Sequence, residues 1–517
     1  MSDEQQEVPE SELIRVRREK LARIIDLGFD PYPTRADADQ SIEEVVAKYG
    51  GKSAQELESE KAHVKIAGRI LTIREFGKTA FLVLSEKTAR IQAYCRKDIL
   101  SEREWSLYQN LDAGDWVLVE GTVFRTKTNE LSVKVQHLNF LAKALRPLPS
   151  KWHGLTDVEQ RYRQRYVDLI VNDDVKRIFE TRAKIVRYIR TYFDTHNFIE
   201  VETPMMQPVA GGAAARPFVT HHNALDIDLY MRVAPELYLK RLIVGGMSRV
   251  YEINRNFRNE GIGYRWNPEF TMLEFYWAYA DYKDLIELTE ELLNGLVREV
   301  KGSETVTWRG AEVSFRRPFP KFTMKEAIAH FSKREISVDD LGDREKLVKL
   351  VKKFGEHRPV AADGTEPPKG TPVPEIASMN EGKLLAELFE SIAEEHLINP
   401  TFITDFPVEV SPLSKQRRDD PRYVERFELF IGGMEIANAF SELNDPDEQA
   451  RRFQQQLSER ERGDEETHQV DDDYVRALEY GMPPTAGEGV GIDRLTMILT
   501  DSPTIRDVIL FPLMRPR

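Results

Sequence analysis

Residues 63 to 141 contain five successive runs of strand-like sequence, and these runs constrain the fold more than any other feature of the chain. The runs are VKIAGRILTI, TAFLVLSE, ARIQAYCR, DWVLVEGTVFRT and ELSVKVQHLNFL. Each is rich in β-branched and aromatic residues, and turn-forming Gly, Asp, Lys and Asn residues separate them. Five short strands in so short a segment predict a small closed barrel.

Small five-stranded barrels include the oligonucleotide-binding type, which stacks single-stranded bases on aromatic side chains beside basic residues. The predicted barrel carries both chemistries, in Arg69, Arg74, Phe76, Lys78, Phe81, Gln92 and Arg125. Many small β-barrels bind no nucleic acid, so the pattern alone leaves a purely structural barrel open.

A helix is predicted before the barrel, from Ser11 to about Leu27. Ser11 is a candidate N-cap and Gly28 a candidate C-terminal stop. Apolar residues recur at helical spacing, and arginines occupy the remaining faces. Two interpretations stay open: a solvated amphipathic helix packed on a neighbour, or a basic helix that contacts RNA phosphates.

The length of 517 residues predicts two or three domains. We expect an N-terminal helical extension at 1–60, the barrel at 61–145, a proline-marked linker at 146–173 and a mixed helix-and-strand domain at 174–517. In that last domain, helices are expected at about 174–196, 235–246, 282–300 and 383–396. Strands are expected at 228–233, 249–258, 268–279, 402–406, 424–431, 434–443 and 488–491, with a hairpin at Thr305–Phe319. Glu356–Pro374, dense in Pro, Gly, Ala and Asp, is expected to be a surface excursion.

Composition narrows the class of protein. No run of 18 apolar residues exists, so no membrane span is expected. The acidic N-terminus does not resemble a secretory signal, and a single cysteine, Cys95, excludes a disulfide framework. A cytoplasmic location is therefore expected. The net charge of −14 excludes a general nucleic-acid coat but not a local basic binding surface.

Neither a GxxxxGK[ST] loop nor a GxGxxG fingerprint occurs, so any nucleotide chemistry needs another scaffold. Three separate segments supply suitable side chains. In RNFRNEGIGYRWNPEF, Arg258 and Glu260 are expected to alternate on one strand face before a turn that leads to Phe270. Arginine binds phosphate or carboxylate, glutamate accepts from an amine, and phenylalanine stacks on a purine. A hairpin with a surface salt bridge is the structural alternative.

The other two segments add glycines and carboxylates. In GEGVGIDRL, three alternating glycines let a ligand approach the backbone, and Arg494 follows in the first turn of a helix. In RFELFIGGMEIANAFSEL, Glu428 and Glu435 flank a double glycine, and Glu442 follows. Carboxylates gathered on one sheet face repel each other unless cations lie between them. Magnesium beside a triphosphate would resolve that repulsion, whereas exposed strand glutamates paired with arginines are the alternative.

These three segments resemble the signature motifs of class II aminoacyl-tRNA synthetases, and the chain resembles the lysyl-tRNA synthetase family over nearly its whole length. The blocks that carry this resemblance are HNFIEVETPMM, GGAAARPFVTHHNALD, APELYLKRL, FRNEG, NPEFTMLEFYWAYADY, ANAFSELNDP and PPTAGEGVGIDR. The resemblance implies an α+β fold, with an antiparallel sheet flanked by helices and a preceding anticodon-binding barrel. It also implies a homodimer whose interface includes HNFIEVETPMM.

The resemblance implies an activity in two steps, in which L-lysine attacks ATP and the lysyl group then passes to tRNA(Lys). It assigns ATP binding to Arg258, Glu260, Arg265, Phe270 and Arg494, and Mg²⁺ to Glu428 and Glu435. Arg258, Glu260 and Arg494 are the implied catalytic residues. Lysine binding is assigned to Gly212, Glu236, Glu274, Tyr276, Asn438, Phe440, Glu442 and Gly489. Anticodon reading is assigned to Phe81, Gln92 and His137.

A cluster of glutamates is physically suited to an ammonium and would repel the aspartate that a sister enzyme binds. Two positions depart from the family pattern. Trp266 stands where the family has a histidine for the γ-phosphate, and His137 stands where it has an acidic reader. Two alternatives remain: a paralogue that charges another amine or a protein, and a catalytically silent tRNA-binding protein.

Overall fold

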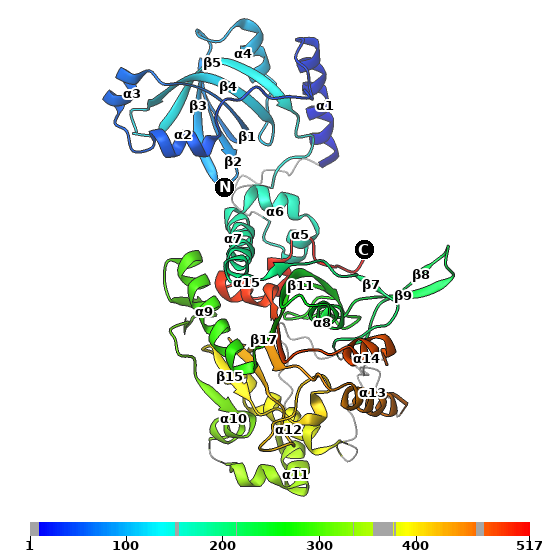
Figure 1. The fold of residues 1–517 in the computed structure, drawn as a ribbon. Helices are drawn as coiled ribbons and strands as arrows, with labels where there is room; N and C mark the ends of the chain where they lie inside the picture. Colours follow the sequence, from blue (N-terminus) through cyan, green and yellow to red (C-terminus); the bar gives the residue numbers. More distant parts are fainter. Residues whose placement is uncertain are drawn as a thin grey trace. The chain divides into compact units, whose positions relative to one another are not determined.

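The computed structural model describes residues 10–149, 155–213, 215–333, 335–354, 376, 379–461 and 470–516. The expected excursion at Glu356–Pro374 lies outside these residues. The chain divides into two compact units, Met1–Arg177 and Ile178–Arg517. We describe each unit by itself (Figure 1).

The first unit is built on a closed barrel, in the order β1-β2-β3-β5-β4. Its strands are β1 (His63–Phe76), β2 (Thr79–Glu86), β3 (Ala89–Arg96), β4 (Trp116–Arg125) and β5 (Leu131–Ala142). The parallel pairing of β3 with β5 joins the meander β1–β3 to the hairpin β4–β5, and the antiparallel pairing of β1 with β4 closes the barrel. The predicted five-stranded barrel is confirmed.

Helices surround this barrel: α1 (Glu10–Asp26), α2 (Ile42–Tyr49), α3 (Ala54–Glu60) and α4 (Glu102–Gln109). Ser11 lies within α1, whose first described residue is Glu10, so the prediction of Ser11 as an N-cap is wrong. Helix starts are hard to place from sequence because the first turn lacks i−4 hydrogen bonds. Gly28 has φ +77°, as predicted for a C-terminal stop.

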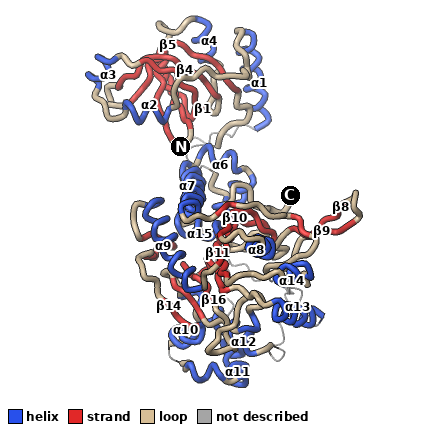
Figure 2. Tube along the Cα trace, viewed as in Figure 1, coloured by secondary structure: helices blue, strands red, loops and turns tan. Residues whose placement is uncertain are grey.

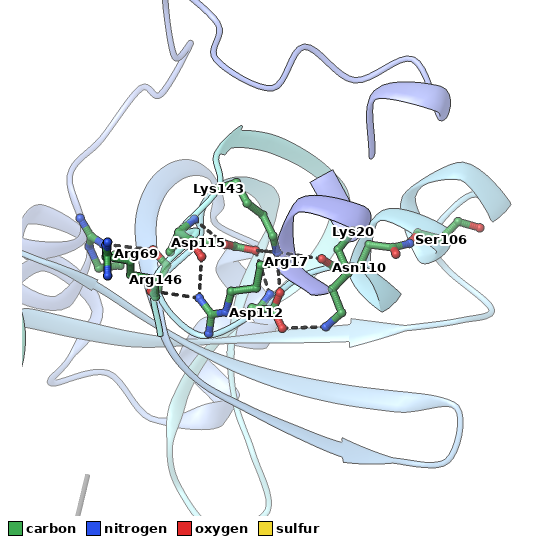
Figure 3. A network of polar contacts seen from close by, with 11 residues as sticks. Arg17, Lys20, Arg69, Ser106, Asn110, Asp112, Asp115, Lys143 and Arg146 are labelled. Atoms are coloured by element: carbon green, nitrogen blue, oxygen red, sulfur yellow. Dashed lines mark hydrogen bonds and ion pairs between the residues drawn. The ribbon is translucent and has the colours of Figure 1, made fainter. Parts of the chain in front are cut away.

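A network of polar contacts ties α1 to the barrel (Figure 3). Arg17 donates to the carbonyls of Ala144 and Arg146, and Lys20 Nζ lies 2.6 Å from Asp112. The buried ammonium of Lys143 donates to Asp112 at 2.6 Å and to Asp115 at 2.8 Å. Two basic side chains of α1 are therefore engaged by the barrel itself, which favours the packed-helix interpretation for that face.

After the barrel come α5 (Val158–Arg163) and α6 (Arg165–Val171), within the segment expected to be a linker. Arg165 and Asp168 form a buried ion pair of 2.6 Å there. The helix α7 (Asp173–Thr195) follows and continues into the second unit.

The second unit contains an eight-stranded sheet in the order β14-β15-β16-β17-β18-β11-β10-β6 (Figure 2). The strands are β6 (Ile199–Glu200), β10 (Arg249–Phe257), β11 (Glu269–Ala278), β14 (Lys321–Thr323), β15 (Thr401–Thr404), β16 (Arg426–Ile431), β17 (Met434–Ser441) and β18 (Thr485–Gly491). All pairings are antiparallel except β10 with β6 and β14 with β15. The antiparallel sheet expected for the fold class is confirmed.

Helices cover both faces of this sheet. α7, α9 (Tyr282–Lys301) and α15 (Ile492–Thr500) share one hydrophobic core with it. On the opposite face, α8 (Glu236–Val244), α13 (Pro446–Glu461) and α14 (Asp472–Glu479) contribute to a second cluster. A third cluster joins α10 (Met324–Phe331), α11 (Arg344–Phe354) and α12 (Glu381–Ile392) to the β14 end of the sheet.

Smaller elements complete the unit. A three-stranded sheet, in the order β7-β9-β8, contains β7 (Met206–Gln207), β8 (Val219–His222) and β9 (Ile227–Met231). Its β8–β9 hairpin projects from the unit (Figure 1). The predicted hairpin near Trp308 is β12 (Thr305–Trp308) with β13 (Ala311–Ser314). The short helices are η1 (Val338–Gly342), η2 (Glu394–His396), η3 (Val408–Val410) and α16 (Ile505–Val508). No helix in the described ranges is long and apolar enough to cross a membrane.

Candidate active site

The register of the central strands brings residues from far apart in the sequence into rows across one sheet face. Glu428 pairs with Asn438, Asn438 with Gly489, Gly489 with Glu274, and Glu274 with Glu252. Directly opposed residues of antiparallel strands point to the same face. Two of the predicted segments, 426–443 and 487–495, therefore meet at the middle of the sheet, beside the strands β10 and β11 that the third segment joins.

A second row lies two residues along, and therefore on the same face. It runs from Arg426 through Phe440 and Gly487 to Tyr276. Each row has a glycine of β18 at its centre. An added Cβ at Gly487 would lie 2.3 Å from Tyr276 Cε1 and 2.4 Å from Glu442 Oε1. The two glycines thus form a floor without side chains of its own, over which side chains of neighbouring strands pack.

Two adjacent cavities lie over this floor. Predicted residues that line the first cavity are Arg258, Glu260, Arg265, Phe270, Glu435, Gly489 and Arg494. Those that line the second are Gly212, Glu236, Arg258, Glu274, Tyr276, Glu428, Glu435, Asn438, Phe440 and Gly489. Arg258, Glu435 and Gly489 line both.

Arg258 and Glu260 follow β10 rather than lying on it, so the prediction of alternating strand positions is wrong. The strand ends at Phe257, and Arg258 N donates to the carbonyl of Pro268. Proline has no N–H to continue the ladder, and Glu260 N turns back to the carbonyl of Arg258. The guanidinium of Arg258 still lies over the Phe270 ring, at 5.1 Å. Its Nε is buried and has no hydrogen-bond partner among the described residues.

The other cations of the first cavity have carboxylate partners. Arg494 Nη1 donates to the Glu435 carboxylate at 3.4 Å and to the Glu435 backbone carbonyl at 2.7 Å, and Arg265 Nη1 lies 2.6 Å from the Glu394 carboxylate. Trp266, 45% exposed, stands at this cavity with its ring edge-on to Tyr264. Arg265 is thus next to Trp266, which stands in place of the family's histidine, but its guanidinium also forms an ion pair with Glu394.

The second cavity is rich in buried carboxyl groups. Burial and the neighbouring Glu236 raise the pKa of Glu274 to about 8, although the Tyr276 hydroxyl donates to it at 3.0 Å. Burial also raises the pKa of Glu236 and of Glu442, against the opposing effect of Lys240. Glu442 does not itself line the cavity, but its Oε1 lies against Gly487, on the side where a side chain of that residue would be.

The two carboxylates predicted to hold magnesium are brought together by the β16–β17 hairpin, whose turn is formed by Gly432 and Gly433 with positive φ. Arg426 Nη2 donates to Glu428 at 2.6 Å. Burial and the nearby Glu435 raise the pKa of Glu428 to about 8. No group of three or more His, Cys, Asp or Glu side chains in the described ranges could hold a metal. A cation here would need further ligands from a substrate or water, as Mg²⁺ commonly takes.

Lys240, Arg426 and Glu394 are site residues that the sequence analysis missed. Lys240 follows Glu236 by four residues in APELYLKRL, and Arg426 precedes Glu428 by two, so both ion pairs have a local sequence signal. Glu394 meets Arg265 across 129 residues, and no sequence pattern indicated that contact.

The predicted nucleic-acid readers lie in the first unit. Phe81 stacks on Tyr94 with ring centroids 4.8 Å apart, and Phe76 and Phe124 extend the aromatic row. Gln92 accepts a hydrogen bond from Ser132, and His137 Nδ1 lies 3.2 Å from Glu104.

Two barrel arginines stabilise the fold instead. Arg125 donates to the carbonyls of Lys52, Gly50 and Asn129. Arg69 donates to Gly114 and lies over the Trp116 ring.

Comparison with known proteins identifies two family matches. The model for class II tRNA synthetases (D, K and N) matches residues 157–515, and that for the OB-fold nucleic acid binding domain matches residues 64–141. A protein of Thioalkalivibrio sulfidiphilus is 49% identical, with 100% of each chain covered. Proteins of Moorella thermoacetica (50% identical; 98% of this chain and 99% of that one) and Halalkalibacterium halodurans (51%; 98% and 97%) are similarly close. All three relatives carry the name lysine–tRNA ligase.

Proposed function

Because this chain belongs to the class II tRNA synthetases, within the lysine–tRNA ligase family, we propose that it activates L-lysine with ATP and transfers the lysyl group to the 3′ end of tRNA(Lys). Full-length similarity to proteins of that name supports lysine and tRNA as substrates. The family resemblance in the sequence is confirmed.

The position of Arg258 between the two cavities is the observation that carries this proposal. Its side chain lines both cavities, and its Nε is buried without a partner in the described chain. A buried donor of this kind costs stability unless a ligand accepts from it. A guanidinium at the junction binds an α-phosphate on one side and a carboxylate on the other, and these are the two groups that must react.

The first cavity is the proposed ATP site. Phe270 stacks on adenine, Glu260 accepts from the exocyclic amine, and Arg494 and Arg265 bind phosphate oxygens. Glu428 and Glu435 are the proposed ligands of Mg²⁺, and their paired carboxylates fit a cation that completes its shell with phosphate and water. When bound, that ion neutralises the charge on the triphosphate.

The second cavity is the proposed lysine site. Glu236 binds the α-ammonium, and Asn438 hydrogen-bonds the carboxylate. Glu274, the Tyr276 hydroxyl and Glu442 bind the ε-ammonium, which reaches Glu442 across Gly487. Gly212, Phe440 and Gly489 complete the walls. An acidic side chain would be repelled by these carboxylates, which supports lysine over aspartate.

The barrel is the proposed anticodon-binding domain, at residues 61–145, between the extension at 1–60 and the linker at 146–173. The catalytic domain then begins at 174. Phe81 stacks on an anticodon base, with Gln92 and His137 as neighbouring readers.

We also propose a homodimer in the cytoplasm. Exposed apolar side chains at Ile199, Met206, Val219, Leu225 and Ile227 support an interface near β6–β9. The single cysteine is compatible with a reducing compartment.

Amino-acid-dependent ATP–pyrophosphate exchange tests the activation step, with each standard amino acid in turn. Exchange with lysine alone is the expected result, followed by lysine-dependent charging of tRNA(Lys). Exchange with a different amino acid would assign the chain to a paralogue. Failure with all of them would leave a tRNA-binding protein without catalysis.

A further inference from the structure

Lys240 is fully buried beside the proposed lysine site and is not among the residues that line the cavity. Its Nζ lies 2.5 Å from Glu236 Oε1 and also forms an ion pair with Glu442 Oε2. The rings of Phe440 and Tyr474 approach the same ammonium, at 5.5 and 5.8 Å. The protein therefore holds an ammonium of its own between two carboxylates of the site.

Each of these carboxylates keeps capacity for a second cation. Glu236 lines the cavity, and Glu442 Oε1 is buried without a hydrogen-bond partner in the described ranges. Gly487 lines the cavity and has no side chain, and a Cβ there would lie 2.4 Å from this oxygen, so Glu442 Oε1 packs directly against the glycine. Lys240 thus contacts one oxygen of each carboxyl group, and the second oxygen of Glu442 is left for a ligand that approaches past Gly487.

When all three carboxyl groups of the cluster are ionised, their charges balance with a diamino acid bound. Glu236, Glu274 and Glu442 supply three carboxyl groups, and Lys240 supplies one ammonium. Bound lysine would add two ammonium groups, while its carboxylate would face Arg258. Buried charges are stable only when they are paired, so three ammonium groups against three carboxylates is the favoured state.

We propose that Lys240 is a positioning residue for substrate selection, an internal ammonium that orients Glu236 and Glu442 so that the two remaining cation positions accept a diamino acid. This inference rests on the proposed function, since it assigns the second cavity to lysine. It adds a residue that never touches the substrate and acts through the two carboxylates.

Removal of Lys240 is expected to change the protonation of Glu236 and Glu442, which a loss of packing alone would not do. Without this cation, burial favours the protonated forms of Glu236 and Glu442, and a neutral carboxyl group binds ammonium poorly. Around the cluster, Glu252, Glu274, Tyr276 and Tyr474 are the other titratable groups, and Arg232 and Arg426 are nearby cations. None of them contacts both carboxylates in the described structure, so none replaces Lys240.

The test compares Lys240→Met with the wild-type full-length protein in ATP–pyrophosphate exchange. We expect KM for lysine to rise at least about tenfold and KM for ATP to change less than about threefold, since one charged partner of a buried cluster is lost. The acid limb of kcat/KM for lysine should move to higher pH by about one unit or more. Lys240→Arg, which keeps the charge, should recover part of both changes.

Lys143→Met is the matched control. Lys143 is also a buried lysine with two carboxylate partners, but it lies in the barrel, and exchange does not involve tRNA. It should lower thermal stability without moving KM for lysine or the pH limb.

Two results would overturn the inference: an unchanged lysine KM in Lys240→Met, or equal losses for lysine and ATP with no shift of the pH limb. If Lys240→Met does not fold, Lys240→Gln, which removes the charge but keeps a hydrogen-bond donor, is expected to show the same shift. Lysine-dependent exchange by the wild type separates the two proposals. Its absence contradicts the proposed function, whereas its presence with an unaffected Lys240 variant contradicts only this inference.

Discussion

Glu274 owes its chemistry to burial on the central strand β11. Burial and the neighbouring Glu236 raise its pKa to about 8 from the ordinary 4.5, against the opposing effect of the hydrogen bond from Tyr276. The folded protein therefore keeps this proton at pH 7, whereas the unfolded chain loses it near pH 4.5. The contribution of Glu274 to the free energy of unfolding is therefore complete below about pH 4.5 and is lost as the pH rises through about 8.

We predict that lysine binding at pH 7 releases about one proton, because the bound ammonium favours the ionised form of Glu274. KM for lysine should accordingly fall as the pH rises from about 6.5 to 8. Calorimetry in buffers of different ionisation enthalpy measures the released proton. Glu274→Gln should release less and bind lysine more weakly. Equal proton release by this variant would assign the proton to another group.

At single positions, the sequence was informative where chemistry is local. Glu274 and Tyr276 are two residues apart in the strand expected at 268–279, which places them on one face, and the hydrogen bond between them bears this out. Lys240 was missed because a lysine four residues after a glutamate is usually an exposed helix pair. Only its burial against Glu442, 202 residues later in the sequence, distinguishes it from such a pair.

At the scale of elements, β18 shows why a glycine-rich strand can form a binding floor. Gly487 and Gly489 face the cavity, whereas the intervening Glu488 is buried on the other side, where Thr289 of α9 donates to it. The alternating glycines of β18 could be read from the sequence. Their neighbours in space could not, because these come from β11 and β17.

Gly487→Ala is predicted to raise KM for lysine by about tenfold or more while KM for ATP stays nearly constant. The new methyl group would overlap the Tyr276 ring and the Oε1 atom of Glu442, and overpacking of this kind costs about 1–3 kcal/mol. Gly491→Ala is the control, because its Cβ would meet no atom nearer than 3.6 Å. Exchange kinetics with each substrate varied in turn measure the difference. A similar lysine KM in both variants would contradict the predicted floor.

At the scale of the whole molecule, the barrel could be predicted from sequence because its strands follow one another and pair mostly with near neighbours. The eight-stranded sheet could not be ordered in the same way. Its central neighbours β11 and β18 are separated by about 200 residues, and nothing in either strand specifies the partner. Only the family resemblance indicated that the three motifs meet.

The division into two units predicts that tRNA recognition and amino-acid activation can be altered separately. Phe81→Ala removes the central ring of the aromatic row from Phe76 to Phe124, and stacking of one base is worth about 1–3 kcal/mol. We expect kcat/KM for tRNA(Lys) to fall by about 5- to 150-fold. Lysine-dependent exchange should stay within about twofold of the wild type, because every residue of the two cavities lies beyond Arg177. Charging and exchange measured on the same preparation separate the effects. A matching loss of exchange would mean that Phe81 supports the fold of the whole chain and not a contact with RNA.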